Sequence, residues 1–294
     1  MAEASEAGVV RMVVNGSCEE DWPEVLALAR RHPSLILPSF GYHPWSVKER
    51  TGAWKEALVR HLDLIPSAIG EIGLDRWIEN YDLPQQEEVF LWQLELAAAR
   101  NLPVSIHCLQ AWGRLEELLR QGPRPAAGFL LHSYGGPPEM IPSFARLGAY
   151  FSLPGYSAHE RKQRQRESFR QVPPDRLLLE TDAPDQPLPE ERKTHHLTDA
   201  KTGRPLHHPA NLAAVHQFAA ELLGEPPGTL AERVEQNFLR LFGGVKARAS
   251  GSDPHRDTHR DTHRDPHRSS DSSSDSNGDG GDRGDSRAGT GGSG

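Results

Sequence analysis

Short apolar runs alternate with longer amphipathic segments along most of the chain. The apolar runs predict buried strands, and segments with apolar residues every three or four positions predict helices. The predicted strands cover residues 9–14, 35–40, 68–71, 103–107, 128–132, 149–153 and 177–182. The predicted helices include residues 20–31, 85–100, 112–121, 159–171, 211–223 and 229–242. Because strands that alternate with helices pair in parallel through right-handed crossovers, the pattern predicts an α/β protein with a (β/α)8 TIM-type barrel.

The number of strands differs by one from that of a closed barrel. Seven strands are predicted, whereas a barrel of this type has eight. Residues 2–8, Ala-Glu-Ala-Ser-Glu-Ala-Gly, are typical of the last turns of a helix that stops at glycine. In an alternating fold such a helix follows a strand. We therefore expect a barrel that is missing its first strand.

The composition changes sharply near residue 249. From Ala249 to Gly294 the chain has no Leu, Ile, Val, Phe, Trp, Tyr or Met, and it repeats the pattern Asp-Xaa-His-Arg in tandem. Such a segment has nothing apolar to bury against the entropy cost of ordering it. The sequence predicts a folded domain at residues 1–248 and a disordered low-complexity tail at residues 249–294. Residues 184–209, rich in Pro and His, are expected to form a long functional or mobile loop.

Charge and cysteine content exclude several classes of protein. The chain has 33 basic and 41 acidic residues, a net charge of −8, and residues 1–248 alone carry −5. A broadly basic nucleic-acid clamp is therefore excluded, and a phosphate substrate needs a local site helped by a bound cation. Two cysteines are too few for a disulfide framework, and no segment approaches the roughly 20 apolar residues of a membrane span. We expect a cytoplasmic protein with no membrane segment, and infer no obligate protein partner.

Four residues that can bind metal come at the ends of predicted strands. Glu71 ends Ala-Ile-Gly-Glu, His107 ends Val-Ser-Ile-His, His132 ends Phe-Leu-Leu-His and Asp182 ends Leu-Glu-Thr-Asp. Taken singly, each is more often a capping or hydrogen-bonded structural residue than a metal ligand. The carboxyl ends of barrel strands meet at one rim, however, so the shared position favours a common metal site.

Two imidazoles and two carboxylates suit one or two divalent cations, and Mg²⁺ is less suited to histidine ligands than Zn²⁺ or Mn²⁺. In such a site Asp182 binds the metal and takes a proton from water, and Glu71 bridges two cations if two are present. A bound cation acidifies water and polarises a phosphoryl or carbonyl oxygen. The residues therefore predict a metal-dependent hydrolase of a phosphodiester, or of another ester or amide bond, with no Ser or Cys nucleophile.

The motifs resemble those of the TatD-type metal-dependent deoxyribonucleases of the amidohydrolase-like barrel superfamily. The resemblance covers nearly all of residues 9–243 and rests on Gly-Tyr-His-Pro at 41–44, Ala-Ile-Gly-Glu-Ile-Gly-Leu-Asp at 68–75, Leu-Pro-Val-Ser-Ile-His at 102–107, Leu-His-Ser-Tyr-Gly-Gly at 131–136, Glu-Thr-Asp-Ala-Pro at 180–184 and Asn-Phe-Leu-Arg-Leu-Phe at 237–242. It implies a (β/α) barrel that hydrolyses phosphodiester bonds in DNA. It also implies that Glu71, His107, His132 and Asp182 are metal ligands.

Two features of the family pattern are absent from this sequence. Members of the family open with a His-x-His pair at the end of the first strand, and here neither the pair nor the strand is present. The segment that usually reads His-Ser-Arg-Asp-Ala is His-Cys-Leu-Gln-Ala at residues 107–111. A catalytically impaired relative, which binds a ligand without turnover, is therefore an alternative to the enzyme.

Other polar residues allow two interpretations each. His43, which precedes Pro44, either contacts substrate phosphate or packs a loop. Asp75 is expected to orient the loop that carries Glu71, and Cys108 is expected to face the helix layer as a buried apolar side chain. The adjacent histidines at 195–196 and 207–208 are expected to lie in a solvated loop.

Overall fold

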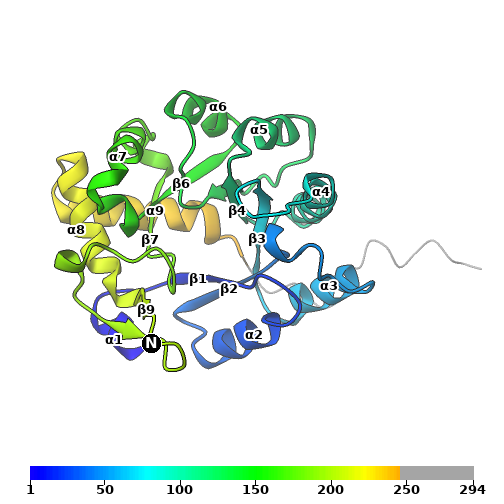
Figure 1. Ribbon diagram of the computed structural model, residues 1–294, viewed down its shortest axis with the longest axis horizontal. Coiled ribbons are helices and arrows are strands. Elements are labelled where there is room, and N and C mark those ends of the chain that lie inside the picture. The colour runs from blue at the N-terminus through cyan, green and yellow to red at the C-terminus, as the bar shows by residue number, and fades with distance from the viewer. Residues whose placement is uncertain (246–294) are drawn as a thin grey trace, which may run out of the picture. The chain divides into compact units, whose positions relative to one another are not determined.

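Seven parallel strands form a curled sheet in the computed structural model, which describes residues 1–245. The strands lie in the sheet in chain order, and every neighbouring pair is parallel. They are β1 (Met12–Asn15), β2 (Ile36–Phe40), β3 (Ala68–Asp75), β4 (Val104–Leu109), β5 (Phe129–Leu131), β6 (Ala149–Pro154) and β7 (Leu177–Glu180). Figure 1 shows the helices arranged around the outside of this sheet. The predicted α/β fold of TIM type is confirmed.

Helices connect successive strands and cover the outer face of the sheet. They are α1 (Ala2–Glu6), α2 (Trp22–Arg31), α3 (Trp54–Leu64), α4 (Leu83–Arg100), α5 (Trp112–Gln121), α6 (Ile141–Arg146), α7 (Gln163–Phe169), α8 (Leu212–Leu223) and α9 (Pro227–Phe242). α5 buries Leu115, Leu118 and Leu119, which share one face of the helix. α4 begins where the Asp82 carboxylate accepts a hydrogen bond from the main-chain N–H of Gln85.

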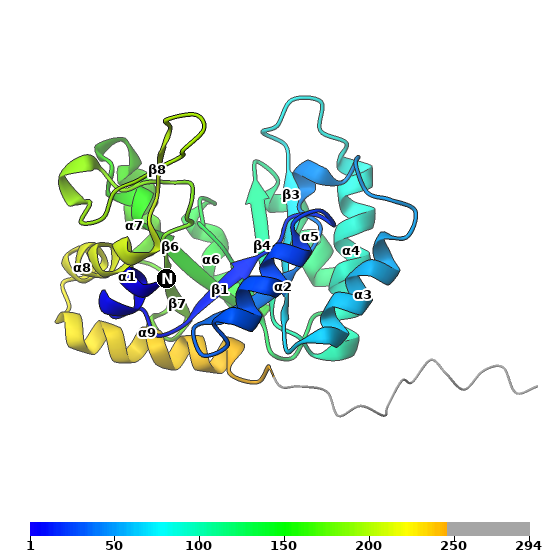
Figure 2. The ribbon, with the colours of Figure 1, turned by 90° about the horizontal axis from the view of Figure 1, so that it is seen from below.

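α9 covers the amino-terminal end of the sheet, opposite the end where the predicted site lies. In Figure 2 it runs along the lower end of the strands. Leu37, Leu130 and Leu178, which belong to β2, β5 and β7, pack with Leu241 and Phe242 of α9. This apolar cluster leaves the carboxyl ends of the strands as the accessible end of the fold.

The sheet does not close on itself within the described residues. β1 and β7 are its two edges, and no ladder joins them. The segment before β1 forms a helix, α1, as its sequence pattern predicts. α1 packs against the turn Pro209–Asn211. A cavity of about 2170 Å³ lies inside the sheet, lined by Val13 of β1 and Leu178 of β7 and, towards the carboxyl ends, by Glu71 and His132. The predicted count of seven strands is confirmed.

The strand boundaries differ from the prediction where the candidate residues lie. β3 continues to Asp75 instead of stopping at Glu71, because residues 72–75 pair with β4 beyond a register shift. Glu71 therefore lies inside β3. β5 and β7 end earlier than predicted, so His132 and Asp182 lie just beyond the strands.

The segments outside the sheet also depart from the predicted pattern. The predicted helix 159–171 is shorter: a 3-10 turn at Glu160–Lys162 precedes α7, in which only Ser168 and Phe169 are buried. Residues 184–209 contain a short antiparallel hairpin of β8 (Leu197–Thr198) and β9 (Pro205–Leu206). The predicted tail at 249–294 lies outside the described residues. No helix in the described part is long and apolar enough to cross a membrane.

Candidate active site

Glu71 lies at the centre of a cluster of imidazoles in the mouth of the cavity. Its Oε1 atom is 2.7 Å from Nε2 of His132, 3.0 Å from Nδ1 of His107 and 3.3 Å from Nε2 of His43. The facing nitrogens of His107 and His132 are 3.2 Å apart. Glu71 and His107 come from neighbouring strands, β3 and β4, and His132 from the residue after β5. The parallel sheet therefore brings together residues that are far apart in the chain.

The partners of His107 determine which of its nitrogens carries the proton. Nε2 donates to Oδ2 of the buried Asp75 at 2.8 Å, so neutral His107 presents the lone pair of Nδ1 to Glu71. Nε2 of His132 approaches the same carboxylate oxygen. Oε1 of Glu71, Nδ1 of His107 and Nε2 of His132 thus face one another. Their lone pairs repel unless a proton or a cation lies between them. A carboxylate behind the far nitrogen of a histidine is also the usual support of a metal ligand. This donor set fits a divalent cation.

His43 meets Glu71 in a different protonation state. Nδ1 of His43 accepts a hydrogen bond from the main-chain N–H of Trp45 at 3.2 Å. The proton of neutral His43 therefore lies on Nε2, which faces Glu71. Ligand atoms of His43, Glu71 and His107 lie within 4.8 Å of one another, a grouping that suits a metal by distance alone. The N–H on Nε2 favours a hydrogen-bond donor over a ligand at His43, and its contact with substrate stays a prediction.

Burial and charge act in opposite directions on this cluster. Burial disfavours the ionised form of Glu71, but the imidazoles of His132, His107 and His43 hold the pKa of this carboxyl well below its usual value. Burial likewise disfavours protonated His132, but the charge of Glu71 raises the pKa of that imidazole well above its usual value. A proton on His132 thus balances the charge of Glu71. A divalent cation in the same place would displace that proton.

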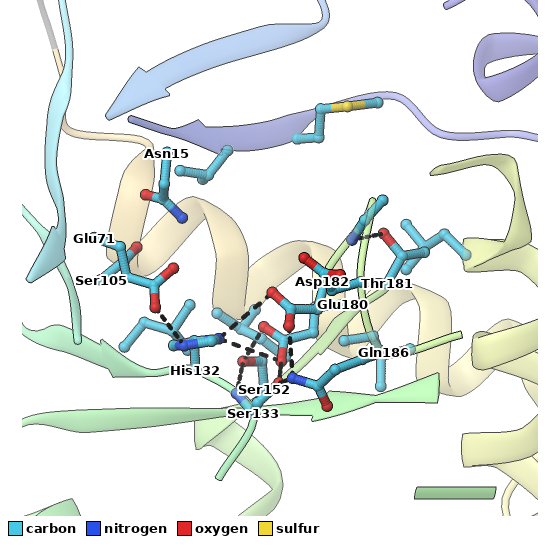
Figure 3. A pocket seen from close by; sticks show the side chains of 18 of the residues that line it. Asn15, Glu71, Ser105, His132, Ser133, Ser152, Glu180, Thr181, Asp182 and Gln186 are labelled. Carbon is cyan, nitrogen blue, oxygen red and sulfur yellow. Dashed lines mark hydrogen bonds and ion pairs between the residues drawn. The ribbon is translucent and has the colours of Figure 1, made fainter. Parts of the chain in front are cut away.

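Asp182 lies beside the other nitrogen of His132. Its Oδ1 atom and Oε1 of Glu180 are each 3.8 Å from Nδ1 of His132. The side-chain amide of Gln186 donates to Oδ2 of Asp182 and to the hydroxyl of Ser133, which in turn donates to Glu180 (Figure 3). One oxygen of Asp182 is therefore held by Gln186, and the other lies on the side of His132.

This hydrogen-bonded group also contains strained backbone. Ser133, Asp182 and Gln186 have φ values of +45°, +56° and +48°, in the left-handed region that non-glycine residues rarely adopt. Such conformations persist where the surrounding contacts hold them, and they are concentrated at functional sites. Burial raises the pKa of Asp182 to about 6, against the opposing effect of His132. Contacts such as the hydrogen bond from Gln186 thus hold Asp182 in an unusual backbone conformation beside the cluster.

Of the four predicted metal-binding residues, the two histidines contact one oxygen of Glu71, and Asp182 lies next to this group. Glu71, His107 and His132 are in direct contact, and Asp182 lies one imidazole ring away. The sequence analysis did not assign roles to Glu180 and Gln186. Glu180 belongs to the quoted Glu-Thr-Asp-Ala-Pro segment, which is a usable signal, whereas nothing in the sequence marks Gln186.

Two of the weaker expectations need correction and one is confirmed. Asp75 orients His107 instead of the loop that carries Glu71, because β3 extends far enough to place its carboxylate against the His107 ring. His207 is buried, not solvated, and its Nδ1 atom lies 2.6 Å from the carbonyl oxygen of Thr181. Cys108 is buried in the apolar layer, as predicted, and burial raises the pKa of its thiol.

Sequence comparison identifies the family to which the chain belongs. The family model described as TatD related DNase matches residues 1–243. The chain belongs to this family. It is therefore a metal-dependent hydrolase that acts on ester bonds, and a divalent metal is in keeping with the His and Glu cluster.

Individual relatives match over most of their length. The 3'-5' ssDNA/RNA exonuclease TatD of Erwinia tasmaniensis is 34% identical over 249 residues, which cover 81% of this chain and 90% of the relative. The uncharacterized metal-dependent hydrolase YjjV of Escherichia coli K12 is 29% identical over 245 residues, with 82% and 90% covered. The crystal structure of YjjV superposes with a TM-score of 0.73 at 28% identity, covering 82% of this chain and 90% of YjjV. A TatD family hydrolase from Entamoeba histolytica, at 18% identity and a TM-score of 0.70 over 82% and 87% of the two chains, shares the fold.

Proposed function

We propose that this TatD-family hydrolase cleaves phosphodiester bonds in nucleic acid, most readily in DNA, with a divalent cation held by Glu71, His107 and His132. The observation that carries the proposal is the convergence of Nδ1 of His107 and Nε2 of His132 on one oxygen of Glu71. Nitrogen and oxygen donors of this kind suit Zn²⁺ or Mn²⁺ better than Mg²⁺. A cation held there would supply Lewis-acid stabilisation of the phosphate charge and acidify bound water.

Asp182 is proposed as a further ligand and as the group that accepts the proton of the attacking water. Burial raises the pKa of Asp182, which makes its carboxylate a better proton acceptor. Gln186 occupies Oδ2, which leaves Oδ1 to take the proton. His43, with its proton on Nε2, is suited to donate a hydrogen bond to a phosphate oxygen. These roles need no Ser or Cys nucleophile.

Nucleic acid is proposed as the substrate because relatives that match most of this chain are named as exonucleases of single-stranded DNA and RNA. The net charge of −8 gives no general attraction for a polyanion, so substrate recognition rests on the local site. Hydrolysis of another ester or amide bond, and binding without turnover, remain the alternatives that experiment separates.

The metal content of purified protein tests the site directly. We predict that His132→Ala loses most of the bound metal, because it removes one of three convergent donors. Activity on labelled oligonucleotides should fall by more than the 10–100-fold typical of changes behind the ligands. His196→Ala is the matched control, since this imidazole is exposed and lies outside the cluster.

Each result has one interpretation. Equal metal content in the wild type and in His132→Ala would refute the proposed ligand set. A protein that binds metal but cleaves only carboxylic esters or amides would shift the substrate class. Metal and oligonucleotide binding without any turnover would identify the impaired relative.

A further inference from the structure

We propose that the mouth of the cavity holds single-stranded nucleic acid between an aromatic wall, Trp45 and Trp77, and a cationic wall, Arg161, Lys162 and Arg164. The inference rests on the proposed function and adds to it the residues of this chain that would select an unpaired strand. All five side chains line the same cavity as Glu71 and His132.

The aromatic wall consists of two large apolar side chains that face solvent. Trp45 is 53% exposed and Trp77 is 63% exposed, whereas Trp22 and Trp54 are buried in the core. A single exposed apolar side chain needs no explanation, but two tryptophans at the mouth of one cavity indicate a binding surface. The ring of Trp45 is 5.1 Å from that of His43, which places it next to the Glu71 cluster.

Asp75 anchors the indole of Trp45 and the backbone of Trp77 before any ligand binds. Nε1 of Trp45 donates to Oδ2 of Asp75 at 2.7 Å, and the main-chain N–H of Trp77 donates to Oδ1 of Asp75 at 2.6 Å. Asp75 is buried and also holds His107. Because the Trp45 ring is already positioned, less ordering entropy is lost when an unpaired base stacks on it.

The cationic wall lies on the segment that follows β6. Between Gly155 and Arg166 the only acidic residue is Glu160, although the chain as a whole is acidic. Lys162 and Arg161 lie 4.8 and 5.2 Å from the ring centre of Tyr156, and no carboxylate of the described chain forms an ion pair with them or with Arg164. Three positive charges at this mouth are therefore available for phosphates.

The segment that carries these cations is held in position by Arg166. Its guanidinium donates to the carbonyl oxygens of Ser157 and His159, at 2.9 and 2.6 Å. The side chains of Arg161 and Lys162 thus extend from a fixed backbone. The chain has a net charge of −8 and does not attract phosphate as a whole. The cationic wall provides local attraction for phosphate at the site itself.

The two walls lie on different sides of the metal-binding cluster. Trp45 and Trp77 follow β2 and β3, the cations follow β6, and β4 and β5 lie between them in the sheet. A strand that crosses the mouth can stack bases on the tryptophans and set phosphates against the cations, with a phosphodiester over Glu71. In a duplex the bases are paired and stacked on each other, so their faces are not available to tryptophan.

Binding to oligonucleotides with and without bases tests the aromatic wall. Fluorescence anisotropy compares an oligothymidylate with an abasic oligonucleotide of the same length, in EDTA so that no cleavage occurs. We expect Trp77→Ala to bind oligothymidylate about 5- to 100-fold more weakly, and to bind the abasic strand as the wild type does. Trp77→Phe should restore most of the affinity. Leu64→Ala, an exposed apolar residue outside the cavity, is the control.

Salt dependence tests the cationic wall. Replacing Lys162 and Arg164 together by Gln should weaken the binding of both oligonucleotides by the same factor. It should also reduce the slope of the logarithm of the binding constant against the logarithm of the salt concentration by about 0.7 per lost phosphate contact. Arg30→Gln, an exposed cation on α2, should leave the slope unchanged.

Three results would overturn the inference: equal binding of the abasic and base-bearing strands by the wild type, unchanged binding by Trp77→Ala, or duplex bound as tightly as single strand. Hydrolysis of a small nitrophenyl phosphodiester by the metal-loaded wild type is measured separately. If that reaction occurs and any of the three results is found, the inference about the aromatic and cationic walls is wrong, whereas the proposed hydrolase function still holds. If no phosphodiester is cleaved, the proposed function itself has failed.

Discussion

One buried carboxylate connects the metal-binding cluster with the surface proposed for substrate. Asp75 accepts hydrogen bonds from Nε2 of His107, from Nε1 of Trp45 and from the main-chain N–H of Trp77. Burial opposes its ionisation, yet these hydrogen bonds lower the pKa of Asp75 to about 2. The ionised carboxylate thereby fixes the tautomer of His107, the indole of Trp45 and the backbone of Trp77.

Asp75→Asn is predicted to weaken metal binding while keeping the fold. Asparagine has the same size, but its NH₂ group faces donors in either orientation. In place of Oδ2 it loses the hydrogen bonds from Nε2 of His107 and Nε1 of Trp45, and in place of Oδ1 it loses those from the main-chain N–H groups of Trp77 and Ile78. In both orientations the negative charge that supports His107 is lost. We expect the Kd for Mn²⁺ or Zn²⁺ to rise 10- to 100-fold, the range for residues that support a ligand from behind. Isothermal titration calorimetry measures it, with Asp63→Asn as a control at a surface ion pair. Unchanged affinity would mean that Asp75 does not orient the ligand.

The candidate residues differ in how far the sequence could reveal them. Glu71, His107 and His132 could be predicted because parallel strands bring equivalent positions to one end of the sheet. Gln186 could not, since its role depends on contact with Ser133, 53 residues away in the chain. Asp75 was visible in its motif, but its partner became evident only with the length of β3.

The secondary-structure elements were predictable where one face of a helix is apolar. α5 occupies the predicted residues 112–121 because its leucines recur on one face. β3 is longer than predicted because its second half pairs with β4 through a close approach of backbones at Gly73. A Cβ atom at Gly73 would lie 1.9 Å from the carbonyl oxygen of His107. Such proximity between distant segments leaves no periodic signal in the sequence.

Gly73→Ala is predicted to destabilise the protein and to displace His107. The added methyl group overlaps the backbone of β4, and a φ of +151° is itself unfavourable for alanine. Overpacking and backbone strain together cost about 3 kcal/mol or more. Thermal unfolding followed by circular dichroism measures the loss. Gly52→Ala is the matched control, because a Cβ atom there meets no atom within 4 Å. Equal melting temperatures for the two variants would show that the strands adjust freely.

At the scale of the molecule, the open sheet and its cavity form one feature. β1 and β7 have no strand between them in the described residues, and the cavity lies along both edges. Four residues that line the cavity have a buried polar atom with no hydrogen-bond partner in the described chain: Asn15 (Oδ1), Ser105 (Oγ), Gln165 (Oε1) and His216 (Nε2). The count of seven strands could be predicted from the apolar runs. The cavity could not be predicted, because its size depends on how α8 and α9, which contact β7, line it.

A strand added before Met1 tests whether these two edges can be bridged. Met1 lines the cavity, so an extension joined to it reaches the space between β1 and β7. One variant carries an extension that alternates valine or isoleucine with threonine, and the control carries a Gly/Ser extension of equal length. We expect the strand-forming extension to raise the melting temperature by several degrees, because it pairs edge groups and fills apolar space, and the control to leave it unchanged. Identical melting temperatures would mean that the cavity between β1 and β7 does not accept a strand.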